Sequence, residues 1–322
     1  MRDRIGTVAR GNTDILALVG LLLVLLVAYQ RYDSSLLTPA SITILSAQFL
    51  PLILAAAGQT TVMLLGGIDL SLGAVLGIAM AVFAVSDAHS AGAVATAAVI
   101  ALGAAVVAGA VNGVLVAYAG LPPIIVTLAA SFLWAGVTLV ILPQPGGSVP
   151  SGLVDAYNNG WNGIALPAVA IAVALALWRL LRTTRHGLAL YAVGGNEHGA
   201  YASGIHTRGV RIAGYALGGA FAGFAGIGLA IQTGSADPTI GAPYTLNSIA
   251  ASVLGGIGFF GGVGRMRGTV LGALVIGLLT NLLLFTGLSP FYQLILQGVV
   301  LIVALALKTL LTRNTRDKEA LA

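Results

Sequence analysis

Two long stretches without a charged side chain constrain this chain more than any other feature. Between Asp87 and Asp155 lie 67 residues with no Asp, Glu, Lys or Arg, and between Arg267 and Lys308 lie another 40. A water-soluble domain carries about 25% charged residues, whereas this chain has 8% charged and 58% hydrophobic residues. Such gaps are typical of segments whose solvent is hydrocarbon. The pattern excludes a soluble enzyme and a nucleic-acid-binding protein.

The apolar runs predict helices that cross a bilayer. A crossing helix takes about 20 residues, because backbone amides in hydrocarbon must be hydrogen-bonded within the segment. Transmembrane strands would alternate apolar and polar residues, whereas these runs are continuous. We therefore expect an all-α, polytopic transmembrane helical bundle in a single domain over 1–322. Its expected spans, about ten, cover residues 14–30, 42–65, 70–86, 91–118, 124–142, 164–181, 212–232, 246–262, 268–287 and 290–308.

The basic residues indicate the orientation of the chain. With ten spans and a cytoplasmic N-terminus, 14 of the 15 Lys and Arg residues fall on the cytoplasmic side, and only Arg31 falls outside. Lys and Arg resist translocation, so this asymmetry supports the orientation and the even number of spans. The longest cytoplasmic segment is then 182–211, the cytoplasmic tail is 309–322, and a long outside loop covers 143–163.

Patterns for catalysis and nucleotide binding are nearly absent. Neither Lys follows a Gly, which excludes a G-x-x-x-x-G-K-[ST] phosphate loop. The chain has no Cys, and its four His residues show no metal-binding spacing, so we expect no metal site. One G-x-G-x-x-G occurs at Gly256, Gly258 and Gly261, but no predicted strand precedes it. We interpret these glycines as packing residues.

The polar residues within the spans are candidates for a solute path. Polar groups in a bilayer are costly unless they face a cavity or one another, so hydrogen bonding between helices is the alternative interpretation for each of them. No well-defined mid-span position is charged, which argues against a carrier driven by a proton or sodium gradient. The path candidates are Gln59, Asp69, Ser71, Asn112, Thr127, Asn247, Ser252 and Asn281.

The segment GGIDLSLG (66–73) interrupts one apolar run. Its paired glycines break a helix, and Asp69 either caps the next helix by accepting from the amide of Ser71 or Leu72, or belongs to the path or its inner gate. Glycines four residues apart also let membrane helices approach closely. The glycines expected to serve packing or gating are Gly66, Gly67, Gly73, Gly255, Gly256, Gly261 and Gly262.

The cytoplasmic sequence GGNEHGAYASGIH (194–206) predicts a short helix. Asn196 is a possible N-cap, Glu197 lies in the first turn, and Gly204 is a possible stop. An isolated helix of this length is marginal in water. It therefore either packs on its own bundle or docks into a partner.

Together these motifs resemble the membrane permease of bacterial ABC importers for carbohydrates, of the ribose and xylose type, within the branched-chain amino-acid permease superfamily. The resemblance rests on the two segments above and on VNGVLVA, LPPIIVTL and SIAASVLGGIGFFGGVGRMRGTVLGA, in family order over residues 40–308. It implies a type II importer fold in the bacterial inner membrane, with both termini cytoplasmic. One departure is YTLNSIAA, where Thr245 and Asn247 stand in place of the acidic residue that the family often has.

The resemblance also implies a function and partners. The chain would form the path for a monosaccharide or similar neutral solute with a second permease copy. A periplasmic solute-binding protein would deliver the cargo, and cytoplasmic ABC ATPase subunits would hold ATP and Mg, with no cofactor in this chain. A branched-chain amino acid as cargo, a secondary carrier and a membrane-embedded enzyme are the alternatives. The implied coupling residues are Asn196, Glu197, His198, Ala200, Ser203, Gly204 and Ile205.

Overall fold

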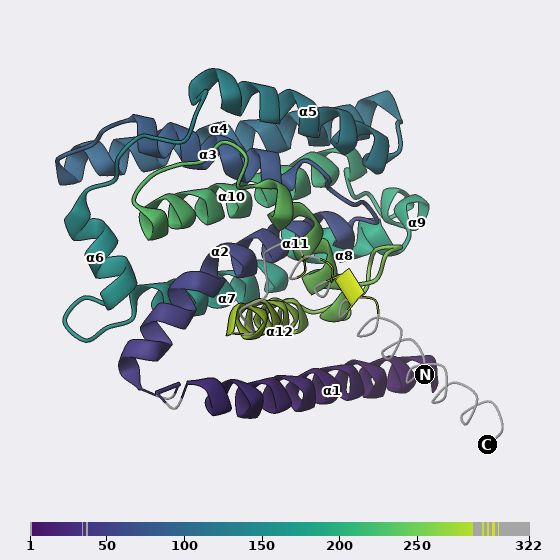
Figure 1. Ribbon diagram of the computed structural model, residues 1–322. Coiled ribbons are helices and arrows are strands. Elements are labelled where there is room, and N and C mark those ends of the chain that lie inside the picture. The colour runs from purple at the N-terminus through teal and green to yellow at the C-terminus, as the bar shows by residue number, and fades with distance from the viewer. Residues whose placement is uncertain are drawn as a thin grey trace.

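The chain forms a bundle of helices (Figure 1). The computed structural model describes residues 2–33, 35–36 and 38–285, and the single positions 292, 295, 298, 299 and 302. Within this part of the chain the regular elements are helices, and extended pairing is limited to two isolated bridges, Gly146 with Ala236 and Trp161 with Ile164. The expectation of an all-α membrane bundle is confirmed.

Seven of the described helices are long and apolar enough to cross a membrane: α1, α2, α4, α5, α7, α10 and α12. In chain order the helices are α1 (Arg2–Tyr32), α2 (Pro39–Leu64), α3 (Leu72–Val85), α4 (Ala91–Ala119), α5 (Pro123–Ile141), α6 (Ser151–Asn159), α7 (Leu166–Thr183), α8 (Arg185–Gly195), α9 (Glu197–Ala202), α10 (Thr207–Thr233), α11 (Ala242–Leu254) and α12 (Met266–Phe285). The expected span 290–308 and the tail 309–322 lie outside the continuously described residues.

Two expected spans are shorter than the sequence pattern indicated. The span at 70–86 is the 14-residue α3, and the span at 246–262 is the 13-residue α11. At 1.5 Å per residue each helix is about 20 Å long, short of the ~30 Å hydrocarbon core. The expected helix over 246–262 is wrong beyond Leu254. There the chain turns through Gly256, Gly261, Gly262 and Gly264, whose positive φ angles end any helix.

Two segments expected as loops contain helices. Helix α6 lies within the outside loop 143–163, and α8 fills most of the cytoplasmic segment between α7 and Asn196. The Thr184 side chain caps α8 by accepting from the Gly187 amide at 3.2 Å. The short helix predicted after Asn196 is α9. The segment expected to be cytoplasmic therefore contains two consecutive helices, α8 and α9.

The core consists of two large apolar clusters that share α2. One cluster joins α2 to α3, α4 and α10, and the other joins α2 to α1, α11 and α12. Small residues hold α4 and α10 together: a Cβ on Gly109 would lie 2.4 Å from the Tyr215 carbonyl oxygen, and one on Gly219 would lie 2.3 Å from that of Ala105. Gly109 and Gly219 therefore allow the two helices to approach closely.

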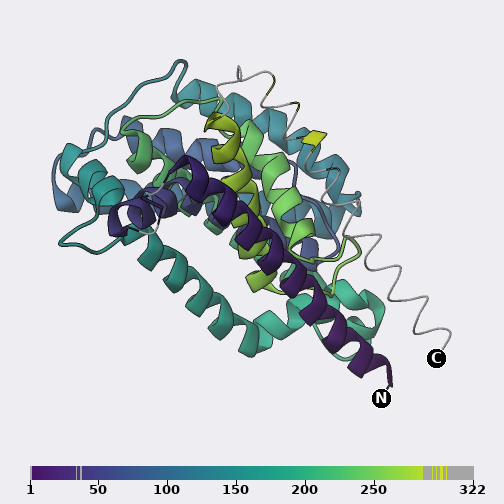
Figure 2. The same ribbon diagram turned by 60° about the horizontal axis from the view of Figure 1, so that its bottom comes forward.

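The ends of the bundle are distinct. In Figures 1 and 2, α6 lies at one end, whereas α8, α9 and the N-terminal end of α1 lie toward the other. This arrangement agrees with the sequence-based expectation that the N-terminus and segment 182–211 share one side of the membrane.

Candidate functional site

Helix α9 is fixed at both ends by the residues that predicted it. The Asn196 side chain accepts a hydrogen bond from the Gly199 amide at 2.9 Å, which confirms the N-cap. At the other end Gly204 has a left-handed φ of +81°, and the Ile205 amide donates to the Ala200 carbonyl at 3.0 Å. This is the usual way in which a glycine closes a helix C-terminus.

Helix α9 has one face on its own bundle and one face in solvent. Ala200 is buried in a cluster with Leu65, Leu190 and Val193. Glu197 accepts two hydrogen bonds from Arg211 of α10 in a bidentate pair. The exposed side chains include His198, Ser203 and Tyr201, which is 73% exposed. The bundle therefore positions α9 and leaves an aromatic side chain on its outer face.

The junction of α8 and α9 also contacts the end of α2 through closely packed backbone atoms. A Cβ on Gly194 would lie 1.7 Å from the Leu64 carbonyl oxygen, which accepts a hydrogen bond from the Gly262 amide at 2.9 Å. A Cβ on Gly261 would lie 2.7 Å from both the Gly194 oxygen and the Gly66 nitrogen. We call these five residues the glycine junction. It joins the coupling segment, the end of α2 and the loop before α12.

A tyrosine strengthens the same contact. Tyr191 of α8 donates its hydroxyl proton to the Gly264 carbonyl at 3.2 Å, and the Arg182 guanidinium lies 5.7 Å from the centre of its ring. Burial raises the pKa of the Tyr191 phenol, which keeps its proton available as a donor. Helix α8 therefore contacts the loop before α12 as well as α2.

The break between α2 and α3 is buried, and side chains satisfy its backbone. With its amide nitrogen facing the Asp69 carbonyl, Gln59 donates to that oxygen at 3.0 Å and accepts from the Asp69 amide at 3.1 Å. Thr127 of α5 donates to the Ile68 carbonyl at 3.1 Å and accepts from the Leu70 amide at 3.0 Å. Non-helical backbone at membrane depth requires such partners. Gln59 and Thr127 therefore hold the break in place.

A chain of polar side chains continues from this break to α5. Asp69 accepts from the Ser71 amide at 2.8 Å and from its hydroxyl at 2.6 Å, both through Oδ1. Asn112 of α4 donates to Ser71 Oγ at 2.7 Å and accepts from Trp134 Nε1 at 3.2 Å. The predicted hydrogen bond from the Ser71 amide is confirmed, although Ser71 itself occupies the N-cap position of α3. We call Gln59, Asp69, Ser71, Asn112 and Thr127 the buried network.

The other three path candidates lie apart from the buried network. Ser252 is fully buried, donates to the Ala56 carbonyl at 3.1 Å or the Ser248 carbonyl at 2.8 Å, and lies 3.2 Å from Thr60. Asn281 of α12 donates to Gln48 of α2 at 2.7 Å. Asn247 lies half-buried on α11. Ser252 and Asn281 therefore join helices, as the alternative interpretation of the polar residues expects.

Three more of the predicted glycines mark close contacts between elements. A Cβ on Gly73 would lie 2.1 Å from the Gly241 oxygen, so α3 and the start of α11 touch. A Cβ on Gly255 would lie 2.4 Å from the backbone of Gly268. A Cβ on Gly67 would lie 2.7 Å from the Tyr215 hydroxyl. These contacts exclude side chains and support packing roles.

Substitutions at Tyr215 and Asn112 test the hydrogen bonding of the buried polar side chains. Among the described residues, the Tyr215 hydroxyl is the one buried side-chain polar atom without a hydrogen-bond partner. We expect Tyr215→Phe to keep or raise the thermal midpoint, because a buried, unpaired hydroxyl costs about 1–3 kcal/mol. Asn112→Leu should lower the midpoint, since Ser71 and Trp134 lose their partner. Size-exclusion chromatography after heating measures both, and a Tyr215→Phe protein less stable than the wild type would contradict the assignment.

Several site residues were not found from the sequence. Gly194 was identified only as part of a helix break, and Trp134, Arg211 and Tyr215 were not selected at all. Arg211 could have been selected as a partner of Glu197, because these opposite charges lie 14 positions apart on the same expected cytoplasmic segment. No sequence pattern predicts the contact between Gly194 and Leu64, since five helices separate the two residues along the chain.

Comparison with known proteins agrees with this arrangement. The family described as "Branched-chain amino acid transport system / permease component" matches residues 41–305. The ribose import permease of Escherichia coli is 42% identical over 258 residues, 77% of this chain and 79% of that protein. The ribose import permease of Bacillus subtilis is 38% identical over 290 residues, 89% of this chain and 90% of that protein.

A third relative carries a different sugar in its name. The D-allose transport system permease of Escherichia coli is 34% identical over 286 residues, 86% of each protein. No solved structure gives a significant match to the chain. The family match covers most of the sequence, and these relatives are aligned over most of their own lengths. The chain therefore belongs to this family of transport-system permeases, and it is a transporter component rather than an enzyme.

Proposed function

We propose that this chain forms the membrane path of an ATP-driven importer for a monosaccharide or a similar neutral, hydroxylated solute. The relatives named for ribose and allose support the cargo class. Helices α4 and α5 support a neutral cargo too, because neither contains an Asp, Glu, Lys or Arg. Spans without charged groups suit a cargo that carries no charge.

The observation that carries the coupling part of the proposal is the contact of Gly194 with Leu64. Through the glycine junction, a displacement of α9 reaches the end of α2 and the segment that holds Asp69. Close-packed backbone transmits such a shift, because it has no side chain that yields. In the proposal, cytoplasmic ATPase subunits bind α9 through Asn196–Ile205 and supply ATP and Mg.

Two exposed aromatic residues support a partner on this end of the bundle. Tyr201 of α9 is 73% exposed, and Phe260, next to the glycine junction, is 95% exposed. Large apolar side chains outside the candidate membrane spans are typical of protein interfaces. The partner set that we propose comprises two ATPase subunits, a second permease copy and a periplasmic solute-binding protein.

The finer topology is also part of the proposal. We infer about ten spans, in which α3 and α11 are short segments packed inside the bundle, with both termini in the cytoplasm and the protein in the bacterial inner membrane. The type II importer fold accounts for this arrangement, and the distribution of basic residues supports the orientation.

Uptake of radiolabelled solutes tests the cargo. We expect cells with this gene deleted to lose most of their uptake of one aldose among ribose, allose and galactose, and a plasmid copy to restore it. The family description names a second cargo class, branched-chain amino acids. Loss of leucine uptake, with the uptake of all three sugars retained, would favour that class and contradict the proposal.

The absence of Cys from the chain permits a direct test of the orientation. Ser203 beside α9 and Ser151 at the start of α6 are both exposed, so a single cysteine at either position is accessible. In intact cells stripped of their outer membrane, Ser151→Cys should react with a membrane-impermeant maleimide and Ser203→Cys should not. After lysis both should react. The reverse pattern would place α9 outside and overturn the coupling role.

A further inference from the structure

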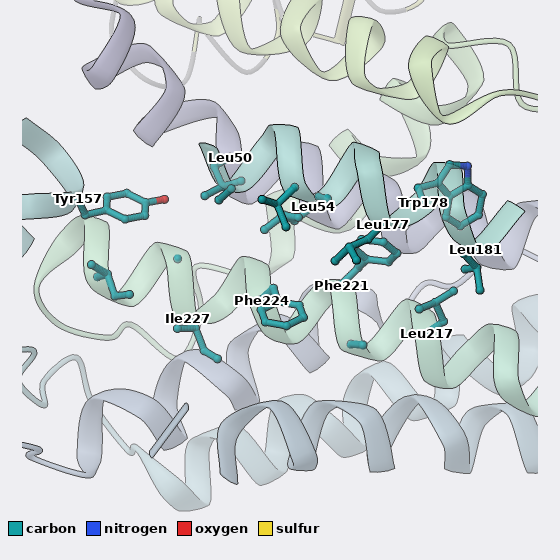
Figure 3. A pocket seen from close by; sticks show the side chains of 16 residues that line it. Leu50, Leu54, Tyr157, Leu177, Trp178, Leu181, Leu217, Phe221, Phe224 and Ile227 are labelled. Carbon is teal, nitrogen blue, oxygen red and sulfur yellow. The ribbon is translucent and has the colours of Figure 1, made fainter. Parts of the chain in front are cut away.

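An apolar cavity opens on the side of the bundle between α7 and α10. Its volume is about 520 Å³, and Figure 3 shows side chains of α7 and α10 that line it, with Leu50 and Leu54 of α2. Leu177 is 60% exposed and Phe224 is 50% exposed. Both flanking helices are candidate membrane spans. The cavity is therefore a groove that faces the hydrocarbon of the membrane.

The groove is longer than the hydrocarbon layer of one membrane leaflet is thick. On α10 it extends from Leu217 to Ile231, which is about 21 Å at 1.5 Å per residue. The hydrocarbon core of a bilayer is about 30 Å thick, so each leaflet contributes about 15 Å. An acyl chain has the length and the apolar surface to fill this groove.

A second cavity of about 540 Å³ continues the groove toward the end of the bundle that carries α8 and α9. Leu181 and Leu217 line both cavities, so the two are adjacent. The second cavity also contains the imidazole rings of His186 and His206. The second cavity thus adds two imidazole side chains to a wall that is otherwise apolar.

The charges near this second cavity are basic. Arg182 in the last turn of α7 and Arg185 at the start of α8 flank Leu181 and His186 in sequence. The acidic residue of this region, Glu197, is paired with Arg211. In the described part of the chain, neither Arg182 nor Arg185 has an ion-pair partner. The Arg182 guanidinium lies over the Tyr191 ring, and neither arginine is among the residues that line the second cavity, so both lie beside it in sequence. Basic residues beside a cavity between membrane helices favour the head groups of anionic lipids.

We propose that the groove binds one anionic phospholipid of the leaflet at the α8–α9 end of the bundle. An acyl chain lies between α7 and α10, and the phosphate lies near Arg182, Arg185, His186 and His206. The site lies on α7 and α10. Helices α8 and α9, the coupling segment, connect these two helices. The lipid would thereby stabilise the wall against which the coupling segment is held.

Binding of defined lipids to the purified full-length chain tests this assignment. Native mass spectrometry is recorded with phosphatidylglycerol and with phosphatidylcholine that carry the same acyl chains. We expect phosphatidylglycerol to bind roughly tenfold more tightly, as one to two charge contacts of about 1 kcal/mol each provide. Arg182→Gln with Arg185→Gln should remove this preference. Equal binding of the two lipids by the wild type would overturn the proposal.

Matched variants on α7 distinguish this site from general attraction to the membrane. Arg179 is two residues from the groove-lining Leu177, about 200° around the helix, so Arg179→Gln should keep the preference. Ala174 lines the groove and Ala176 does not. Ala174→Trp should weaken the binding of both lipids, and Ala176→Trp should weaken the binding of neither. If Ala174→Trp does not fold, the exposed pair Ala170→Phe and Ala172→Phe makes the same comparison.

Three other outcomes would contradict the lipid site. Arg179→Gln could lose its preference for phosphatidylglycerol as fully as the double variant does. That result would indicate diffuse charge attraction. Unchanged lipid binding in both groove-filling variants would place the lipid elsewhere. Loss of a dimer in the mass spectrum of Ala174→Trp, with lipid binding retained, would show that a second copy of the chain occupies the groove.

Discussion

Gly194→Ala is expected to reduce uptake by roughly tenfold or more, whereas Gly195→Ala is expected to leave uptake near the wild-type level. The new Cβ at Gly194 would lie 1.7 Å from the Leu64 carbonyl oxygen, and the nearest atom to a Cβ at Gly195 is 3.8 Å away. Overpacking costs about 1–3 kcal/mol where side chains adjust. Here the opposing atom is backbone, so α8 must move away from α2.

The two positions form a matched pair. Both are glycines in the last turn of α8, and any gain in helix propensity from alanine, up to about 1 kcal/mol, applies to both. The measurements are uptake of the identified sugar and abundance of the protein in the membrane by in-gel fluorescence. Normal uptake by Gly194→Ala at normal abundance would show that the glycine junction does not couple α9 to the path.

Asp69→Leu is the second substitution with a large expected effect. Oδ1 of Asp69 accepts from the Ser71 amide and from the Ser71 hydroxyl, and the residue is 3% exposed. Leucine leaves two buried donors without an acceptor, at about 1–3 kcal/mol each. We expect the protein to lose roughly tenfold or more of its membrane abundance and its uptake.

Asp69→Asn separates the structural role of this side chain from a role of its charge. Asparagine retains an oxygen that accepts from Ser71, so the turn into α3 is kept. Because both observed hydrogen bonds use one oxygen, we expect Asp69→Asn to retain most of the uptake. Loss of uptake at normal abundance would instead assign the carboxylate to the translocation path. Abundance and uptake are measured together on the same cells.

The membrane helices and the short coupling helix were predictable because their signals are local. A crossing helix has to be apolar over about 20 consecutive residues whatever it packs against. The cap at Asn196 and the stop at Gly204 act within one or two turns, so neighbouring letters carry them. The same local reasoning failed at 246–262, since an apolar run with several glycines is compatible with both a helix and a series of left-handed turns.

The site itself was only partly predictable. The residues of the buried network could be selected one at a time, because polar side chains are rare in such spans. Which of them meet depends on how α2, α4 and α5 pack, and that separated Ser252 and Asn281 from Asp69. Likewise, the groove between α7 and α10 has no sequence signal, since its lining residues are ordinary apolar residues of two spans.

The sequence by itself determined that this protein is a helical membrane bundle with a short capped helix on its basic side. These properties follow from solvation and from hydrogen bonds between near neighbours. The tertiary structure alone decided that Gly194 touches Leu64, that Gln59 and Thr127 satisfy the break around Asp69, and that a groove separates α7 from α10. Contacts between distant segments depend on the packing of whole helices, which no short stretch of sequence encodes.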